Sequence, residues 1–286
     1  MNAIYEYILA TVVVILLVGL TFVNLTSSTF IGIDILNGDQ INTVAGEVFN
    51  KIILTPGDPV DWNRTNVNSL GLAKVNSTAF TLDRDKVLCL KNGSINGNEA
   101  VRLLGLEHLY NFSLSISPAL IINVTKISYI AGRHSFNVMV KDLNGLPVST
   151  VVVEGYYVNN TDDWNTGDAI VRNSTTTGIN GLATLNFTSK NPKDVVLLIT
   201  AKSYTTVTLA EFYVPNSSYT SPSTLNPPKA LTVQGDYVVE GQPIIGAFTF
   251  PSPEPQGVLK TVSLSQFVSI DDYMYEVNFH FWSVSQ

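Results

Sequence analysis

The feature that most constrains the fold of this chain is a run of uncharged, mostly apolar residues near its start. No charged side chain occurs between Glu6 and Asp34, and residues 8–23 read ILATVVVILLVGLTFV. About 20 apolar residues, at a helical rise of roughly 1.5 Å each, span the ~30 Å hydrocarbon layer of a bilayer. A helix is the single-segment structure that satisfies its own backbone there. The run therefore predicts a long hydrophobic α-helix within residues 1–38.

Glu6 lies close to the start of this run. A carboxylate one turn into an apolar helix costs several kcal/mol in hydrocarbon unless it is paired. The nearest cation is an N-terminal ammonium, because the first Lys or Arg is Lys51. Pairing with a neighbouring chain's ammonium would set the register of stacked helices, and the predicted assembly residues are Glu6, Ile8, Val12, Ile15, Leu16, Gly19 and Phe22. Alternatively, Glu6 is an interfacial residue that reaches water at the membrane face.

Two other interpretations of the apolar run stay open. A plain signal-anchor needs only the apolar helix. A cleaved secretory signal needs a basic n-region and a small-residue cleavage site, which the first thirty residues do not supply.

Composition narrows the function classes. The chain is 45% hydrophobic, which is enough for a core, but only 14% charged against about 25% in typical soluble domains. Its net charge of −7 would be repelled by phosphate backbones, so we expect no nucleic-acid partner. Cys89 is the only cysteine, which excludes an intramolecular disulfide.

A second helix is predicted after residue 38. Its apolar stripe repeats at helical spacing over Ile41, Val44, Ala45, Val48, Phe49 and Ile52. Asp39 stands at the N-cap position and Pro56-Gly57 ends the run.

After residue 57 the pattern changes to short strands. Strands are predicted at 79–82 and 86–90, turns at Asn92-Gly93 and Asn96-Gly97, and one short helix within 98–110. From Tyr110 the apolar residues Phe112, Leu114 and Ile116 alternate with serines, as in a half-buried strand.

The C-terminus also reads as a strand. Tyr275, Val277, Phe279 and Phe281 alternate with Glu276, Asn278, His280 and Trp282. An end this apolar must be paired within a sheet, because an unpaired apolar edge aggregates. We infer that it completes the sheet begun by residues 57–116, so that the middle of the chain is an insertion.

Two loop motifs characterise that insertion. The pattern D-x-N-G-x-P-V occupies 142–148, and T-G-x-N-G-x-A-T-L-x-F occupies 177–187. The layout resembles bacterial Ig-like and transthyretin-like surface modules over about residues 117–215. The resemblance implies a spacer or adhesive β-sandwich.

A second resemblance covers residues 1–116 and 230–286. Behind the apolar run come Pro56-Gly57-Asp58-Pro59 with Trp62, then Leu70-Gly71-Leu72-Ala73, Leu82-Asp83, Lys86 and the closing strand 275–282. In this order the motifs resemble archaeal type IV pilin-like surface proteins. The resemblance implies a subunit that is inserted in the membrane, then assembled by pilus machinery into an extracellular filament of many copies. Trp62 would fill the gap between helix and sheet.

These patterns together predict an α+β fold: a long N-terminal hydrophobic α-helix, an antiparallel β-sandwich head and an Ig-like β-sandwich insertion. The expected boundaries are 1–38 for the helix, 39–116 for the first part of the head, 117–215 for the insertion, 216–228 for a linker and 229–286 for the strands that complete the head. The expected function is an adhesion filament subunit; the alternative is a monomeric, signal-anchored surface or S-layer-associated binding protein.

No catalytic motif was found. The chain lacks the G-x-S-x-G, H-E-x-x-H and phosphate-loop patterns, and its histidines, His108, His134 and His280, lie far apart, so we expect no enzyme and no cofactor. Asp162, Asp163, Asn165 and Asp168 form a weak Ca²⁺ candidate, with an Asx-rich hairpin tip as the alternative.

Ten N-x-[ST] sequons occur in the chain. Those expected in loops are candidate acceptors of N-linked glycans in a glycosylating secretory pathway: Asn63, Asn76, Asn92, Asn159, Asn173 and Asn216.

Overall fold

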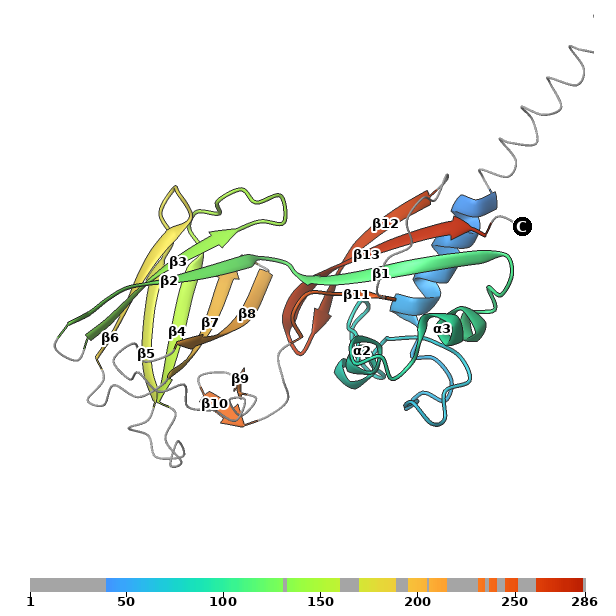
Figure 1. Ribbon diagram of the computed structural model, residues 1–286, viewed down its shortest axis with the longest axis horizontal. Coiled ribbons are helices and arrows are strands. Elements are labelled where there is room, and N and C mark those ends of the chain that lie inside the picture. Colours follow the sequence, from blue (N-terminus) through green and yellow to red (C-terminus); the bar gives the residue numbers. More distant parts are fainter. Residues whose placement is uncertain are drawn as a thin grey trace, which may run out of the picture.

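The computed structural model describes residues 40–130, 133–159, 170–188, 195–204, 206–214, 231–234, 237–240, 245–251 and 261–284. These form two units in series, a head of helices on a sheet and a β-sandwich, at opposite ends of the long axis (Figure 1). The head contains a helix at 40–54, α2 (Arg84–Lys91), α3 (Gly97–Leu104), β1 (Tyr110–Pro118), β11 (Phe248–Phe250), β12 (Thr261–Ile270) and β13 (Tyr273–Ser283).

The head sheet pairs strands that lie far apart in the sequence. Its strand order is β11-β1-β13-β12, and β13 pairs antiparallel with β1 from Tyr110↔Ser283 to Pro118↔Tyr275. The C-terminal strand therefore lies beside the strand at 110–118. Strands β12 and β13 are joined by the exposed two-residue turn Asp271-Asp272, where both residues have positive φ.

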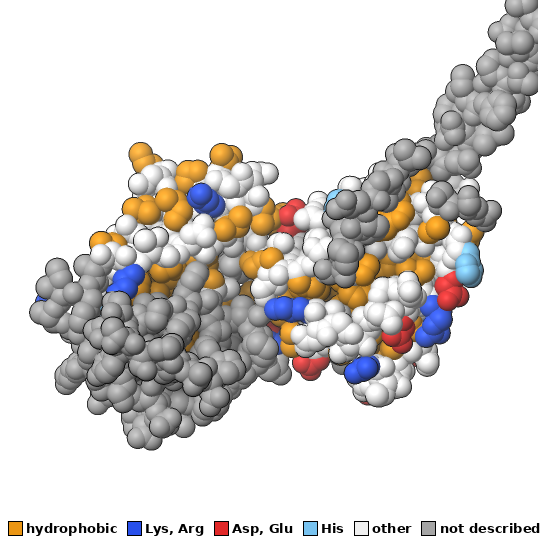
Figure 2. Space-filling model, viewed as in Figure 1, with side chains coloured by type: hydrophobic (Ala, Val, Ile, Leu, Met, Phe, Trp, Pro, Cys, Tyr) orange, Lys and Arg blue, Asp and Glu red, His pale blue; other side chains and the backbone are white. Residues whose placement is uncertain are grey.

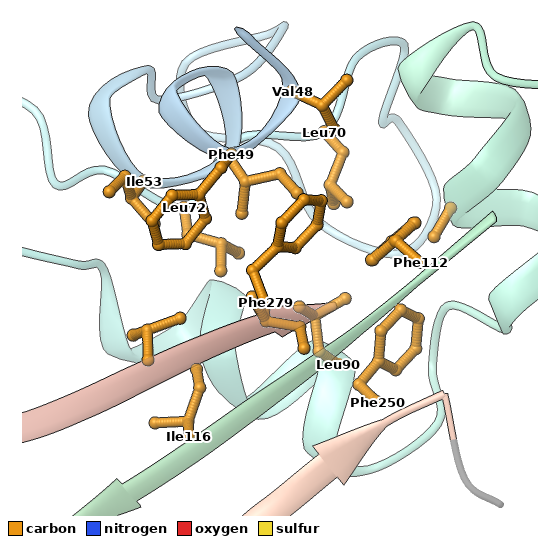
Figure 3. Close-up of a cluster of buried hydrophobic side chains, with 14 of the residues drawn as sticks. Val48, Phe49, Ile53, Leu70, Leu72, Leu90, Phe112, Ile116, Phe250 and Phe279 are labelled. Atoms are coloured by element: carbon orange, nitrogen blue, oxygen red, sulfur yellow. The ribbon is translucent and has the colours of Figure 1, made fainter. Parts of the chain in front are cut away.

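The helix at 40–54 covers one face of this sheet. Its buried side chains are Ile41, Ala45, Val48, Phe49, Ile52 and Ile53, which confirms the helical stripe read from the sequence. The ring of Phe49 stacks on that of Phe279 at 5.3 Å between centroids, and Phe112 lies beside Phe279 (Figure 3). Burial of each such aromatic side chain contributes about 2–3 kcal/mol.

Two short helices flank this core, and the first corrects a prediction. Residues 86–90 belong to α2 rather than a strand, because Asp83 caps the helix by accepting hydrogen bonds from the backbone N–H groups of Asp85 and Lys86. Asn96 caps α3 in the same way through Glu99 N–H, so Asn96-Gly97 begins a helix instead of forming a turn. The short helix expected within 98–110 is confirmed as α3.

The sandwich contains β2 (Ile121–Ile130), β3 (Arg133–Lys141), β4 (Val152–Asn159), β5 (Ile170–Thr176), β6 (Leu182–Thr188), β7 (Val195–Ser203) and β8 (Thr206–Val214). One antiparallel sheet has the order β2-β3-β6 and the other β5-β4-β7-β8. Side chains from both sheets share one core, which includes Phe136, Phe187, Tyr157 and Leu197. A separate two-stranded ribbon pairs β9 (Leu231–Gln234) with β10 (Tyr237–Glu240). An antiparallel β-sandwich in the chain is thus confirmed.

The predicted fold class is wrong. The described chain is mostly β-sheet, 50% strand and 17% helix, and its three helices include none that is long and apolar. The segment for which such a helix was predicted, residues 1–38, lies outside the described residues. The head is also no sandwich, because helices rather than a second sheet cover the apolar face formed by Leu114, Val277 and Phe279.

Candidate functional site at the junction of head and sandwich

The two units meet at a two-residue crossover between β1 and β2. Ala119 and Leu120 are both buried. The N–H of Ala119 donates to the carbonyl oxygen of Met274 in β13 at 2.9 Å, and the N–H of Leu120 donates to Thr208 Oγ1 in β8 at 3.2 Å. Each peptide of the crossover is therefore bonded to a different unit, which satisfies donors that would otherwise be buried without partners.

An apolar contact adds to these hydrogen bonds. Tyr273, at the start of β13, packs against the outer face of the four-stranded sandwich sheet. The buried residues on that face are Tyr156, Val158, Val196, Leu198 and Leu209. The head thus covers apolar surface that a free-standing sandwich would expose to water.

A small pocket opens beside this contact. Arg84 at the start of α2 forms an ion pair with Asp271 in the β12–β13 turn, at the edge of the pocket. The other lining residues are Leu209, Ile245, Ile270, Tyr273 and Tyr275. Burial raises the pKa of the Tyr275 phenol well above its usual value. Together these contacts can hold the sandwich at a fixed angle to the head.

Within the head, a buried lysine of α2 is hydrogen-bonded to the loop that follows the helix at 40–54. The Lys86 side chain is 3% exposed, and its Nζ donates to the carbonyl oxygens of Pro56 and Val60, each at 2.7 Å. It also lies 5.8 Å from the centre of the Trp62 ring. Burial lowers the pKa of this ammonium, while the charges of Asp83 and Asp61 act in the opposite direction.

The residues of the P-G-x-P-x-x-W motif surround this lysine. Trp62 Nε1 donates to the carbonyl oxygen of Gly71 at 2.7 Å. Gly57 has φ +80°, and a Cβ there would lie 2.6 Å from Trp62 Nε1. Trp62 is buried within the loop, between Gly57, Gly71 and Lys86. The motif therefore forms a clamp that fastens the loop at 55–73 to α2.

The two loop motifs of the sandwich also lock together. Thr177 Oγ1 donates to the carbonyl oxygen of Val148 and accepts from the N–H of Val151. Asp142 Oδ1 accepts from the N–H groups of Asn144 and Leu146 within the neighbouring turn. Ile179 and Leu146 are held outward, 95% and 62% exposed. Figure 2 shows hydrophobic side chains interspersed with polar ones on the upper side of the sandwich.

An ion-pair network on the sandwich was missed by the sequence reasoning. Glu154, nearly buried in β4, binds Arg172 of β5 at 3.2 Å and Lys202 of β7 at 3.1 Å. Burial raises the pKa of Glu154, but the hydrogen bonds and charges of Lys202 and Arg172 outweigh it and leave the pKa below its usual value. A glutamate inside the apolar run at 151–158 was the available signal, because such a charge requires partners.

The predicted site residues fall into three groups. Asn63, Asn76 and Asn92 are exposed in the head, and Asn173 lies in β5. Asn159 ends β4, and its side chain is not described. The remaining candidates lie outside the described residues: Glu6, Ile8, Val12, Ile15, Leu16, Gly19, Phe22, Asp162, Asp163, Asn165, Asp168 and Asn216.

The histidines occupy three separate environments. His108 is exposed with positive φ, and His134 is buried against the rings of Phe136 and Tyr157. His280 Nδ1 lies 2.9 Å from Ser263 Oγ, but within the described chain it has no hydrogen bond to a carboxylate. No group of three His, Cys, Asp or Glu suited to a metal occurs among the described residues.

Comparison with known proteins adds no relative. No protein-family model matches the chain, and no curated protein matches it at a significant level. Within the part of the chain that the structure describes, no helix combines the length and apolarity needed to cross a bilayer.

Proposed function

We propose that the chain is a structural subunit of an extracellular, type IV pilus-like filament. The observation that carries this proposal is the junction, where a two-residue crossover is hydrogen-bonded to both units. The described chain begins at the helix 40–54, and the sandwich lies at the far end of the molecule from it (Figure 1). A subunit whose apolar segment precedes this helix in sequence, and whose sandwich lies far from the helix, suits polymerisation through that segment and outward display of the sandwich.

Assembly would proceed through the apolar segment 8–23. Before assembly this segment would lie in the membrane, where the pilus-type machinery would take up the subunit. In the filament it would contact the same segment of neighbouring copies, so that protein contacts replace lipid contacts of similar apolarity. Glu6 would pair with a neighbour's terminal ammonium, because an unpaired carboxylate is costly in such surroundings.

The sandwich would then act as the displayed spacer or adhesive module. Strands β2 to β8 form two antiparallel sheets with a shared core, and this β-sandwich is compatible with the Ig-like module that the sequence motifs imply. Strand β5 pairs with β4 in the four-stranded sheet, so β5 and β6 belong to different sheets. The hydrogen-bonded loops that expose Leu146 and Ile179 would present these two apolar side chains to an adhesion partner.

The test is the state of the chain on native cells. We would shear surface appendages, image them by cryo-electron microscopy and identify their subunit by mass spectrometry. Filaments built from this chain are the expected result, and Glu6→Ala should abolish them. The matched control is Glu107→Ala, which removes an exposed carboxylate of the head and should leave filaments unchanged. Recovery of the chain only as a detergent-soluble membrane monomer would overturn the proposal in favour of an anchored surface protein.

A further inference from the structure

The structure separates the N-x-[ST] sequons by the availability of two atoms, the asparagine Nδ2 and the hydroxyl oxygen. At Asn111 the hydroxyl residue Ser113 is fully buried. At Asn173 the Nδ2 already donates to the carbonyl oxygen of Asn186 at 2.7 Å. Neither sequon presents both groups to an enzyme when the chain is folded.

Asn63 differs from these sequons because its own threonine orders it. Thr65 Oγ1 donates to Asn63 Oδ1 at 2.7 Å, and the Thr65 N–H donates to the same oxygen at 2.9 Å. Both residues are exposed, and the described chain offers no hydrogen bond to Asn63 Nδ2. Asn66 Oδ1 accepts from the Asn63 N–H at 2.6 Å and braces the turn from the other side. The nucleophilic nitrogen is therefore presented to solvent with the rest of the carboxamide held in place.

The neighbouring sequons are exposed but are not ordered in this way. The Thr78 hydroxyl of the Asn76 sequon pairs with Thr81 Oγ1 at 2.9 Å instead of with its asparagine. Asn92 is the C-cap of α2, and its hydroxyl residue Ser94 is half-buried. A preformed turn lowers the ordering cost of recognition, so these two sites should be modified less fully than Asn63.

We propose that Asn63 is the principal N-glycosylation site of the folded head. The donor would be a glycan carried on a lipid phosphate or diphosphate, delivered by a membrane-bound transferase. Asn63 Nδ2 forms a bond to the anomeric carbon of the first sugar while the bond from that carbon to the phosphate oxygen breaks. The amide loses one proton to a base of the transferase, and the lipid phosphate leaves with the bonding electrons.

Asn63 lies on the solvent-exposed side of the clamp around Lys86, so a glycan there would leave the loop's buried contacts intact. Trp62, which precedes Asn63, is buried and points into the clamp, while Asn63, Arg64 and Thr65 are all exposed. The proposal does not depend on filament assembly, since it rests on the geometry of the head alone.

The experiment is site-resolved mass spectrometry of the full chain, expressed in a host that N-glycosylates a co-expressed reporter protein. We expect Asn63 to carry glycan in most molecules, with Asn111 and Asn173 bare. Asn66→Ala keeps the sequon but removes the brace, and should lower occupancy at Asn63 several-fold. The matched control, Asn68→Ala, removes a nearby exposed amide whose Nδ2 donates to Asp58 Oδ2 at 3.2 Å rather than to the sequon, and it should leave occupancy unchanged. Circular dichroism would establish that both variants are folded.

Three outcomes would overturn the proposal. An unmodified Asn63 beside a fully modified reporter would exclude the site. Equal occupancy at Asn63 and Asn111 would mean that modification follows sequence alone, before folding. Unchanged occupancy in Asn66→Ala would show that the turn plays no part.

Discussion

The head and the sandwich reach closed cores by different routes. The sandwich forms its two sheets from one stretch of chain, 121–214, in which neighbouring strands pair through hairpins at β2–β3, β4–β5 and β7–β8. The head pairs β1 with β13, and these strands are separated by almost the whole of the remaining chain. Closing so long a loop costs conformational entropy before any contact forms. The sandwich therefore closes its inner core with its own strands, whereas the core of the head depends on β13.

The largest effect expected from this difference is at Phe279. Its ring is fully buried and stacks on Phe49 and Phe281. Phe279→Ala should destabilise the head by about 3–5 kcal/mol, because it leaves a cavity where two layers meet. Hydrogen exchange measured by mass spectrometry should show lost protection in head peptides and retained protection in β3 and β6. Phe136→Ala is the matched change in the sandwich and should produce the opposite pattern. Equal loss in both units would mean that they unfold as one.

The second test removes the buried ammonium of the clamp. Lys86→Met keeps most of the side-chain volume but leaves the carbonyl oxygens of Pro56 and Val60 without their donor. The expected destabilisation is about 3 kcal/mol, since hydrogen bonds from a charged donor are involved. Urea unfolding followed by tryptophan fluorescence would measure it, because Trp62 lies within the clamp. An unchanged midpoint would refute the bracing role of Lys86.

A smaller effect is expected at Gly155 in the sandwich core. A Cβ at this position would lie 2.6 Å from Leu185 Cδ1 and 2.7 Å from Phe187 Cζ. Gly155→Ala should lower the free energy of unfolding of the sandwich by about 1–3 kcal/mol through overpacking, and it should leave the head unaffected. Gly46→Ala in the helix of the head is the control, because a Cβ there meets no atom within 4 Å. Thermal unfolding would compare the two, and a lower Tm for Gly46→Ala than for Gly155→Ala would contradict the packing argument.

The smallest expected effect is on the pH dependence of the sandwich's stability. The pKa of Glu154 is lower in the folded sandwich than in the unfolded chain, so its contribution to stability is present above the unfolded pKa. That contribution should decline as pH falls from about 4.5 through the lowered folded pKa. Its size is about 1 kcal/mol or less, because Arg172 and Lys202 are partly exposed. Glu154→Gln should flatten this part of the sandwich's stability curve, measured by urea unfolding at several pH values. A curve of unchanged steepness would assign the acid sensitivity to other groups.

The apolar periodicity of the sequence predicted much of the fold. The stripe from Ile41 to Ile52 is helical. Apolar and polar residues alternate over 112–116 and over 277–281, and both segments are strands of the head sheet. The predicted strand at 86–90 is wrong because the capping side chain of Asp83 outweighs the local strand propensity of Val87 and Leu88.

The candidate site was less predictable. The ion pair between Arg84 and Asp271 joins residues that are far apart in sequence. Thr208 and Leu120 look like ordinary strand residues, and only the packing of two units brings them together. Pattern analysis identifies which face of an element is buried, whereas the partner on that face depends on tertiary structure.

Because β13 follows every strand of the sandwich in sequence, the order of synthesis has a consequence for folding. A chain interrupted before residue 273 contains every strand of the sandwich, β2 to β8, but lacks the central strand of the head sheet. Such a product would display a folded sandwich above an open head, with Phe49 and Phe112 exposed to water and available to proteases. Synthesis through β13 is thus a condition for a closed head, because a shorter product exposes apolar side chains that the closed head buries.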